Sequence, residues 1–183
     1  MVTIIRSAPV LHSHWAQYLQ YVAQGITMDY GDKLVLKGGT ALKLCYELPR
    51  MSIDLDFDSL EHHNLESSLK THSMDFFNHN FNISGDFSSI IKQKNTIISS
   101  HYIIHWKSFN KNLRIAYSPL TIDVSIRKIN KEFRNDICIQ NGICTYNLDR
   151  LIDTKLNAIV GIYAKKRTKL KDFFDAEFIL NNY

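Results

Sequence analysis

Residues 34–58 read LVLKGGTALKLCYELPRMSIDLDFD, and this stretch decides the fold. It starts with a short apolar run, turns at Gly38-Gly39, continues as an amphipathic segment that ends before a proline, and closes on an alternating Asp-x-Asp. Glycine adopts positive φ freely and lets the backbone approach a ligand closely, whereas proline stops a helix. We therefore predict a strand, a glycine turn, a helix over residues 41–47 and a second strand over residues 52–58.

The second strand has one apolar and one polar face. Its apolar positions are Ile53, Leu55 and Phe57, and its polar positions are Ser52, Asp54, Asp56 and Asp58. A period of two is typical of a half-buried strand, so the carboxylates share one face. Hard cations bind carboxylate oxygens that converge from fixed positions, which makes Asp54 and Asp56 candidate metal ligands. The backbone amides of Gly38, Gly39 and Thr40, at a helix N-terminus, are candidate phosphate ligands.

A third acid lies on a later strand. Asp123 stands between Ile122 and Val124, in a run that again alternates between apolar and polar residues. A carboxylate is an unusual choice in the middle of a strand. We expect Asp123 to complete the metal site, and its carboxylate could accept the proton of an attacking hydroxyl.

The rest of the chain alternates between helical and extended patterns. Apolar residues three to four apart predict helices, whereas period-two or aromatic runs predict strands. We expect helices over residues 11–26, 60–81, 148–164 and 168–181, strands over residues 96–106, 113–117 and 120–127, a loop around residues 84–89, and a hairpin over residues 137–146 that turns at Asn141-Gly142. The predicted fold class is α/β (α+β), a mixed central β-sheet flanked by helices, with further helices at the C-terminus.

No internal repeat, low-complexity tract or long linker divides the chain. Its 183 residues, 45% of them hydrophobic and 22% charged, are enough to bury a core. We therefore expect one compact unit, in which residues 1–146 form the core and residues 147–183 form a helical segment that completes the active site.

Charge and cysteine content indicate the surroundings of the protein. The net charge of +4 is compatible with an anionic partner but does not by itself predict nucleic-acid binding. Three cysteines, Cys45, Cys138 and Cys144, match no zinc pattern and are typical of reduced thiols. The N-terminus lacks the pattern of a signal peptide, and no apolar run is long enough to span a membrane. We expect a cytoplasmic protein without a membrane partner.

Three charged residues near the C-terminus have two interpretations. Lys155 lies at the edge of an apolar helical stripe, where its ammonium needs an anion unless its long stem reaches water. Asp172 and Asp175, three apart on one helical face, are either functional or part of an exposed charge-paired surface with Lys171.

Histidines and aromatic residues also have ordinary structural interpretations. Neighbouring His62 and His63 point in different directions on a helix and are expected at the surface or in a loop. A later run either stacks on bases or is a core strand with one polar face, and it contains His101, Tyr102, His105, Trp106 and Lys107.

Order and spacing together resemble a known family. Lys37–Leu42, the Asp54-Leu55-Asp56-Phe57 run and the later Ile122-Asp123-Val124 are similar to the signature of the DNA polymerase beta-type nucleotidyltransferases. Residues 50–57, RMSIDLDF, resemble more narrowly the AbiEii/AbiGii toxin family of toxin–antitoxin and abortive-infection systems. The tail agrees with that family through Lys155, Ala158, Arg167 and Lys171-Asp172-Phe173-Phe174-Asp175.

The resemblance implies an NTP-dependent nucleotidyltransferase that releases pyrophosphate. Asp54, Asp56 and Asp123 would hold Mg²⁺ or Mn²⁺, and Asp172 would orient the triphosphate or the acceptor. Phosphate contacts would come from Gly38, Gly39, Thr40, Ser52 and Lys155, with Lys37 or Arg50 adding charge. The general base is either Asp123 or Asp172.

The same resemblance implies an RNA acceptor, with the 3′ end of tRNA as the leading candidate, and a cognate antitoxin. The basic cluster Lys165–Lys171 is a candidate for contacts with the RNA backbone. Two other functions are compatible with the motifs. One is nucleotidyl transfer to a small molecule or a protein hydroxyl, and the other is a non-catalytic module that binds RNA or a partner.

Overall fold

A mixed seven-stranded sheet forms the centre of the protein in the order β3-β4-β5-β2-β1-β7-β6. The computed structural model describes residues 8–81, 87–108, 119–126, 134–163 and 170–183. The strands are β1 Leu34–Lys37, β2 Asp54–Ser59, β3 Phe87–Thr96, β4 Ser99–Ser108, β5 Leu120–Ile126, β6 Ile137–Gln140 and β7 Ile143–Tyr146. The pairs β2–β5 and β1–β7 are parallel, and the other neighbours are antiparallel. This arrangement confirms the predicted α/β fold class.

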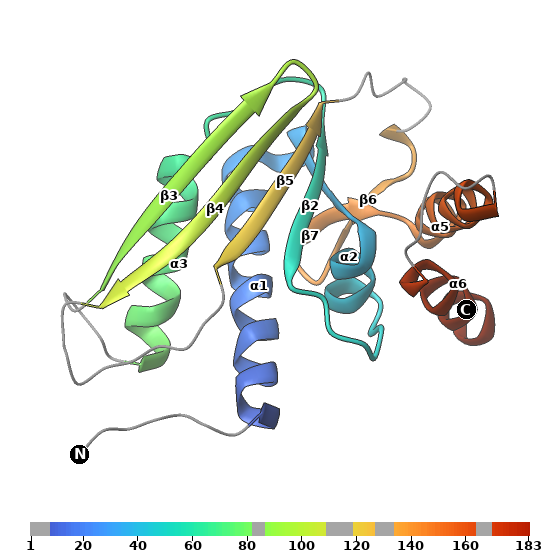
Figure 1. The fold of residues 1–183 in the computed structure, drawn as a ribbon, viewed down its shortest axis with the longest axis horizontal. Coiled ribbons are helices and arrows are strands. Elements are labelled where there is room, and N and C mark those ends of the chain that lie inside the picture. The colour runs from blue at the N-terminus through green and yellow to red at the C-terminus, as the bar shows by residue number, and fades with distance from the viewer. Residues whose placement is uncertain (1–7, 82–86, 109–118, 127–133, 164–169) are drawn as a thin grey trace.

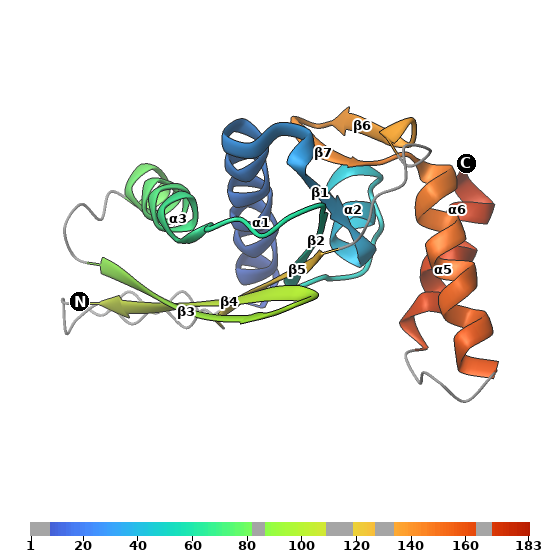
Figure 2. The same cartoon turned by 90° about the horizontal axis from the view of Figure 1, so that it is seen from above.

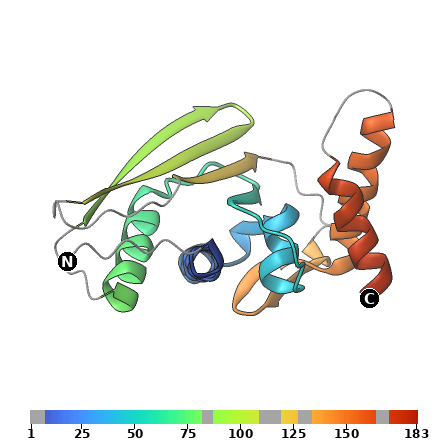
Figure 3. The same ribbon diagram turned by 60° about the horizontal axis from the view of Figure 1, so that its bottom comes forward.

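Helices flank the sheet on both sides of its central strands. They are α1 Ala8–Tyr30, α2 Gly38–Cys45, α3 Glu66–Phe81, α5 Leu148–Tyr163 and α6 Lys171–Asn182, with a short 3₁₀ turn at Gly31–Lys33. The helices α1 and α3 lie against one face of the β3–β4–β5 half of the sheet (Figures 1 and 2). The helices α5 and α6 pack side by side beyond α2, at the opposite end of the molecule (Figure 3).

The core lies mainly between α1, α3 and the sheet. The buried rings of Tyr18, Phe76 and Phe77 cluster there, with centroids 5.2 to 5.5 Å apart. The Tyr18 hydroxyl lies 3.0 Å from that of Ser73, so a polar group at the centre of this cluster has a hydrogen-bond partner. Tyr102 from β4 faces the same side and is fully buried. This packing holds one face of β4 against the helices and leaves the alternate residues on the other face.

The predicted hairpin turn is confirmed in detail, and a side-chain cap explains where α5 begins. Asn141 and Gly142 both have positive φ, at 53° and 75°, which is the backbone of a tight hairpin turn between β6 and β7. Asn147 caps α5, because its side-chain oxygen accepts a hydrogen bond of 2.9 Å from the backbone N–H of Arg150.

Several boundaries differ from the predictions. The second helix begins at Gly38 rather than Ala41, so Thr40 lies inside its first turn and does not cap it. The third helix begins at Glu66, because residues 60–65 connect β2 to it. The predicted loop around residues 84–89 is partly wrong, since β3 begins at Phe87. The predicted strand 113–117 falls outside the described residues. Among the described helices, none is both long and apolar enough to cross a membrane.

Candidate active site

Five strand residues form one row across the sheet. In the strand register, Lys37 on β1 pairs with Asp56 on β2, and Asp56 pairs with Asp123 on β5. Asp123 pairs in turn with His101 on β4, and His101 pairs with Lys94 on β3. Directly opposed residues on neighbouring strands point to the same face. Asp54 lies on that face too, two residues before Asp56. The three predicted carboxylates therefore share one region of the sheet.

The pKa of Asp56 is perturbed, mainly because this carboxyl group is buried. Burial raises the pKa of Asp56, and the neighbouring charges of Asp123 and Asp54 raise it further, while Lys37 and Lys171 oppose the shift. The ionised carboxyl is thus unfavourable there until a cation approaches.

These carboxylates have the oxygen donors that Mg²⁺ or Mn²⁺ prefers. In the described part of the chain, however, no three His, Cys, Asp or Glu side chains are already arranged as a metal-binding group. Asp123 instead accepts a 2.5 Å hydrogen bond from Nδ1 of His101. Mg²⁺ usually binds through one or two carboxylates together with substrate phosphates, so an incomplete protein ligand set fits a metal that arrives with a nucleotide.

The glycine turn brings backbone close to this carboxylate. Gly38 has a φ of 75°, and a Cβ placed there would lie 3.1 Å from Oδ2 of Asp56. A Cβ on Gly39 would collide with the guanidinium of Arg50. Both positions therefore require glycine, and they begin α2, whose first backbone N–H groups have no intrahelical acceptor. This geometry suits an anion.

Thr40 and Ser52 lie behind the turn. The buried Thr40 hydroxyl donates to the backbone oxygen of Asp54 and lies 2.6 Å from the Ser52 hydroxyl. These contacts tie the start of α2 to the start of β2. The two side chains thus position the turn, and the backbone amides are the groups that face a ligand.

Lys37 lies at the end of β1 with its ammonium between two strands. Its Nζ donates to Oδ1 of Asp58 and, at 3.0 Å, to the Ser125 hydroxyl. The other Asp58 oxygen accepts a 3.2 Å hydrogen bond from the Tyr146 hydroxyl. Asp58 is buried, so this contact with Lys37 offsets the cost of burying its charge.

The C-terminal helices contribute a buried ion network. Lys155 on α5 contacts Asp172 at 2.9 Å and Asp175 at 2.7 Å, and all three side chains are at most 7% exposed. Arg50 contacts both oxygens of Asp175, at 2.5 and 2.6 Å. Burial opposes ionisation of Asp175, but the hydrogen bonds from Arg50 and Lys155 outweigh it and lower the pKa of Asp175. The network joins α5 and α6 to the loop before β2.

A pocket of about 220 Å³ opens between the glycine turn and these helices. Its lining residues are Lys37, Gly38, Gly39, Asp56, Asp58, Tyr146, Arg150, Thr154, Lys155, Ala158, Lys171 and Asp172. Six predicted site residues therefore meet in one pocket. Five others lie outside the lining: Asp54 and Asp123 adjoin Asp56, Thr40 and Ser52 lie behind the turn, and Arg50 reaches the pocket wall through Asp175.

Sequence reasoning missed part of this lining. Asp58 was on the predicted polar face, but its contacts with Lys37 and Tyr146 required the register of β1, β2 and β7. Asp175 does not line the pocket but holds the lining residue Lys155; the sequence leaves it two interpretations, and its burial excludes the exposed surface. Arg150 and Thr154 carry no motif. The spacing of four residues from Arg150 to Thr154, and again from Thr154 to Ala158, is the signal that they share a helix face.

Adjacent carboxylates on parallel strands, beside a Gly-Gly helix start and a cationic pocket, define the nucleotidyltransferase class of enzymes. The comparison with protein families agrees: the profile of the nucleotidyl transferase AbiEii toxin family, of type IV toxin–antitoxin systems, matches residues 24–183. The chain belongs to this family. Membership confirms the predicted enzyme class and implies an NTP substrate and an antitoxin partner.

Two solved structures are similar over nearly the whole chain. JHP933 from Helicobacter pylori has a TM-score of 0.70 and 27% sequence identity, over 97% of this chain and 68% of that one. A Helicobacter pylori protein proposed to be a nucleotidyltransferase has a TM-score of 0.71 and 28% identity, over 97% of this chain and 70% of that one. The search of curated proteins gives no match.

Proposed function

We propose that this toxin-family enzyme transfers a nucleoside monophosphate from an NTP to the 3′ end of an RNA, with tRNA as the expected acceptor. The attacking RNA hydroxyl oxygen bonds to the α-phosphorus of the NTP, the bond from that phosphorus to the bridging oxygen breaks, and pyrophosphate leaves. The observation that carries this proposal is the row in which Asp56 and Asp123 lie side by side next to the Gly38-Gly39 turn.

The pocket next to Asp56 has the groups needed to bind the triphosphate of the NTP. Gly38 and Gly39 offer backbone amides at a helix N-terminus, and the cationic side chains in the lining are those of Lys37, Arg150, Lys155 and Lys171. Lys155 is held by Asp172 and Asp175, so its ammonium is fixed in place before a nucleotide arrives. Arg50 fixes Asp175 in turn, which makes Arg50 a positioning residue rather than a direct phosphate ligand.

Asp54, Asp56 and Asp123 would hold Mg²⁺ or Mn²⁺. A divalent cation bound there supplies charge neutralisation for the phosphates and lowers the pKa of the attacking hydroxyl.

Asp123 is the better placed of the two candidate bases. Its side chain is 48% exposed and adjoins Asp56, whereas that of Asp172 is 1% exposed and contacts Lys155. A base must reach the proton that it accepts, so exposure beside the reacting centre favours Asp123. Asp172 would instead orient Lys155.

The C-terminal segment belongs to the catalytic unit in this proposal. Residues 1–146 supply the carboxylates and the turn, and residues 147–183 supply Lys155, Lys171 and Asp172. The contact between Arg50 and Asp175 supports treating the two parts as one compact unit. The three cysteines are free thiols, which fits action in the cytoplasm.

Label transfer tests the proposal. The protein is incubated with each α-³²P-labelled NTP, Mg²⁺ or Mn²⁺, and total tRNA, and the RNA, protein and small-molecule fractions are separated. Label on the RNA 3′ end is expected, and Asp56→Asn should abolish it. Label on protein or on a small molecule alone would show that the acceptor is not RNA. No label in any fraction would contradict nucleotidyl transfer.

A further inference from the structure

The catalytic face of the sheet continues beyond the carboxylates onto the hairpin β3–β4. The side chain of His101 contacts Asp123, so His101 lies on the same face as the carboxylates. Ile103 and His105 follow on that face by alternation, while Tyr102 and Ile104 between them are fully buried on the other. Lys94, the register partner of His101 on β3, is exposed. We call the outward positions Lys94, His101, Ile103 and His105 the outer hairpin face.

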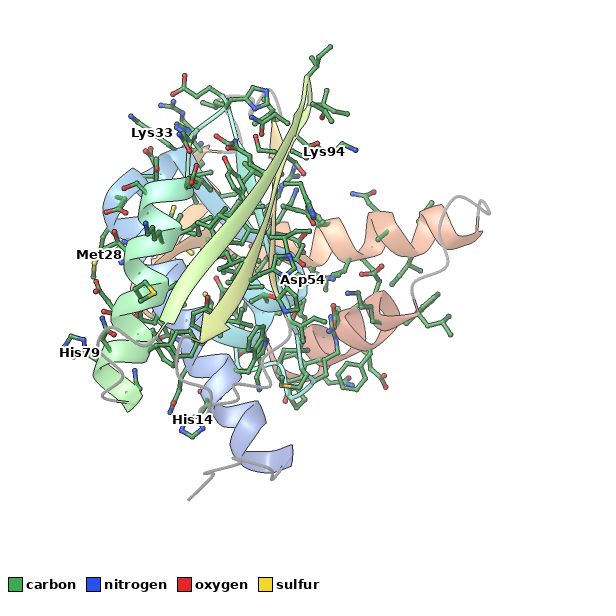
Figure 4. All side chains as sticks on the ribbon, turned by 60° about the vertical axis from the view of Figure 1, so that its left-hand side comes forward. His14, Met28, Lys33, Asp54, His79 and Lys94 are labelled. Carbon is green, nitrogen blue, oxygen red and sulfur yellow. The ribbon has the colours of Figure 1, made fainter. Side chains whose placement is uncertain are left out.

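No described helix covers the outer hairpin face. The helices α1 and α3 lie on the opposite side of these strands (Figures 1 and 2). Figure 4 shows Lys94 and Asp54 on the side of the strands that faces away from α3. The open surface is therefore continuous with the face of the sheet that carries Asp54 and Asp123.

The charge of the hairpin suits a polyanion. Residues 87–108 contain three lysines, Lys92, Lys94 and Lys107, and two histidines but no aspartate or glutamate. Within the described strands, the only acids next to the outer hairpin face are the proposed catalytic carboxylates, those of Asp54, Asp56 and Asp123. Two strand spacings separate Asp123 on β5 from Lys94 on β3, which is about 10 Å. This is within the reach of the last nucleotides of a strand whose end is at Asp123.

The pocket leaves this side open to the acceptor. Its lining residues, as far as the structure describes them, come from β1, β2, β7, α2, α5 and α6, and none of these comes from β3, β4 or β5. In an in-line displacement the leaving pyrophosphate and the attacking hydroxyl lie on opposite sides of the reacting phosphorus. If the triphosphate occupies the pocket side of Asp56, the acceptor must approach from the side of Asp123 and His101.

We propose that the single-stranded 3′ end of the RNA acceptor lies across the outer hairpin face, with its terminal hydroxyl at Asp123 and its upstream phosphates at Lys94. The histidines of β4 offer planar rings on which unpaired bases can stack. This inference rests on the proposed RNA acceptor and deepens it, because it assigns the acceptor a surface on β3 and β4 rather than on the basic tail. Lys171, the described member of that tail, lines the nucleotide pocket instead.

The test compares Lys94→Gln and the double variant Lys92→Gln/Lys94→Gln with Lys70→Gln, an exposed lysine on α3. Lys92 lies two residues before Lys94 on β3 and is the register partner of Ile103. RNA affinity is measured by fluorescence anisotropy against salt, and nucleotide affinity by calorimetry with a non-hydrolysable NTP. We expect the double variant to bind RNA about tenfold more weakly and to lower the salt slope by about 0.7 per lysine, with unchanged nucleotide affinity. Lys70→Gln should match the wild type.

Label transfer separates the two proposals. If the wild type labels RNA and the double variant labels it with the same KM for RNA, the outer hairpin face is not the acceptor surface. A protein partner would then be the remaining candidate for binding to this face. If the wild type labels no RNA, the RNA acceptor itself fails, and this inference fails with it. A rise in the KM for RNA at constant KM for NTP supports the inference.

Discussion

Asp56 on β2 and Asp123 on β5 are direct register partners in a parallel strand pair, so two carboxylates lie side by side with no spacer strand between them. Burial raises the pKa of Asp56, and the neighbouring charge of Asp123 adds to that shift. We expect Asp56→Asn to lower kcat/KM by on the order of 10³-fold, because it removes a proposed metal ligand and its charge from the proposed reacting centre. The melting temperature should stay the same or rise, since repulsion is relieved.

The combination of lost activity and retained stability is the informative result. Asp153→Asn on the exposed face of α5 is the matched control and should leave both quantities unchanged. Activity is followed by label transfer and stability by circular dichroism. If Asp56→Asn unfolds the protein, the residue is structural, and the proposed site loses its centre.

Local sequence patterns were sufficient to predict the central strand β2. The alternation of residues 52–58 predicted a half-buried strand, and β2 buries Leu55 and Phe57 while Asp54 and Asp56 remain partly exposed. The hairpin at Asn141-Gly142 was equally direct, because both residues tolerate positive φ. The sequence does not predict the strand β3, because residues 87–95 show no clear alternation of apolar and polar residues, and pairing with β4 makes this edge strand regular.

The contacts of the site were harder to predict than its residues. Order and spacing predict Asp54, Asp56 and Asp123 as site residues, and the structure places them on one face, but the pattern around His101 predicts a stacking or core residue rather than the partner of Asp123. That bond depends on the register of β4 against β5, which no local pattern reveals. For Lys155 the sequence indicated the need for an anion, and the structure supplies Asp172 and Asp175 from a different helix.

The stability of the metal-free protein should depend on pH through Asp56. Its raised pKa means that the folded protein retains this proton more readily than the unfolded chain does. The resulting stabilisation is fully present below the unfolded pKa, about 4, and is lost as the pH rises through the folded pKa. In EDTA we therefore expect the stability difference between Asp56→Asn and the wild type to grow in favour of the variant over this range.

Added Mn²⁺ should offset that loss, because a cation binds the ionised carboxylate. We expect the rise in melting temperature on adding Mn²⁺ to be larger at pH 7 than at pH 4.5, and to be small in Asp56→Asn at either pH. Differential scanning fluorimetry measures these shifts. An equal Mn²⁺ effect in the wild type and the variant would argue against Asp56 as a ligand.

The ion network of α6 gives a prediction about stability. Asp175 is fully buried and holds Arg50 and Lys155 together. Asp175→Asn leaves two cations without this charge, so the free energy of unfolding at pH 7 should fall by roughly 3–5 kcal/mol. Glu177→Gln, an exposed change on the same helix, should stay within about 0.5 kcal/mol. Urea denaturation compares them.

The same network also predicts an acid-side pH dependence. Because the pKa of Asp175 is lowered in the folded state, its stabilisation is present above the unfolded pKa of about 4 and is lost as the pH falls through the lowered folded pKa. The difference between the wild type and Asp175→Asn should therefore shrink in that acidic range. A constant difference down to the acid transition would show that packing, and not charge, dominates.

The glycine turn can be tested with two alanine substitutions that have opposite expectations. At Gly38 the φ of 75° disfavours any side chain, and the new Cβ would press on the Asp56 carboxylate. Gly38→Ala should therefore lower the free energy of unfolding by about 1–2 kcal/mol and also reduce transfer, with a higher KM for NTP. Gly161 lies in α5, and beyond the backbone of the helix itself no atom of the described residues comes within 4 Å of the position that a Cβ would take. Gly161→Ala should raise stability by about 0.5–1 kcal/mol through helix propensity and leave the KM unchanged. If Gly38→Ala loses stability but keeps the KM for NTP, the turn shapes the fold without holding the triphosphate, and the phosphate site must be sought among the lysines of the pocket.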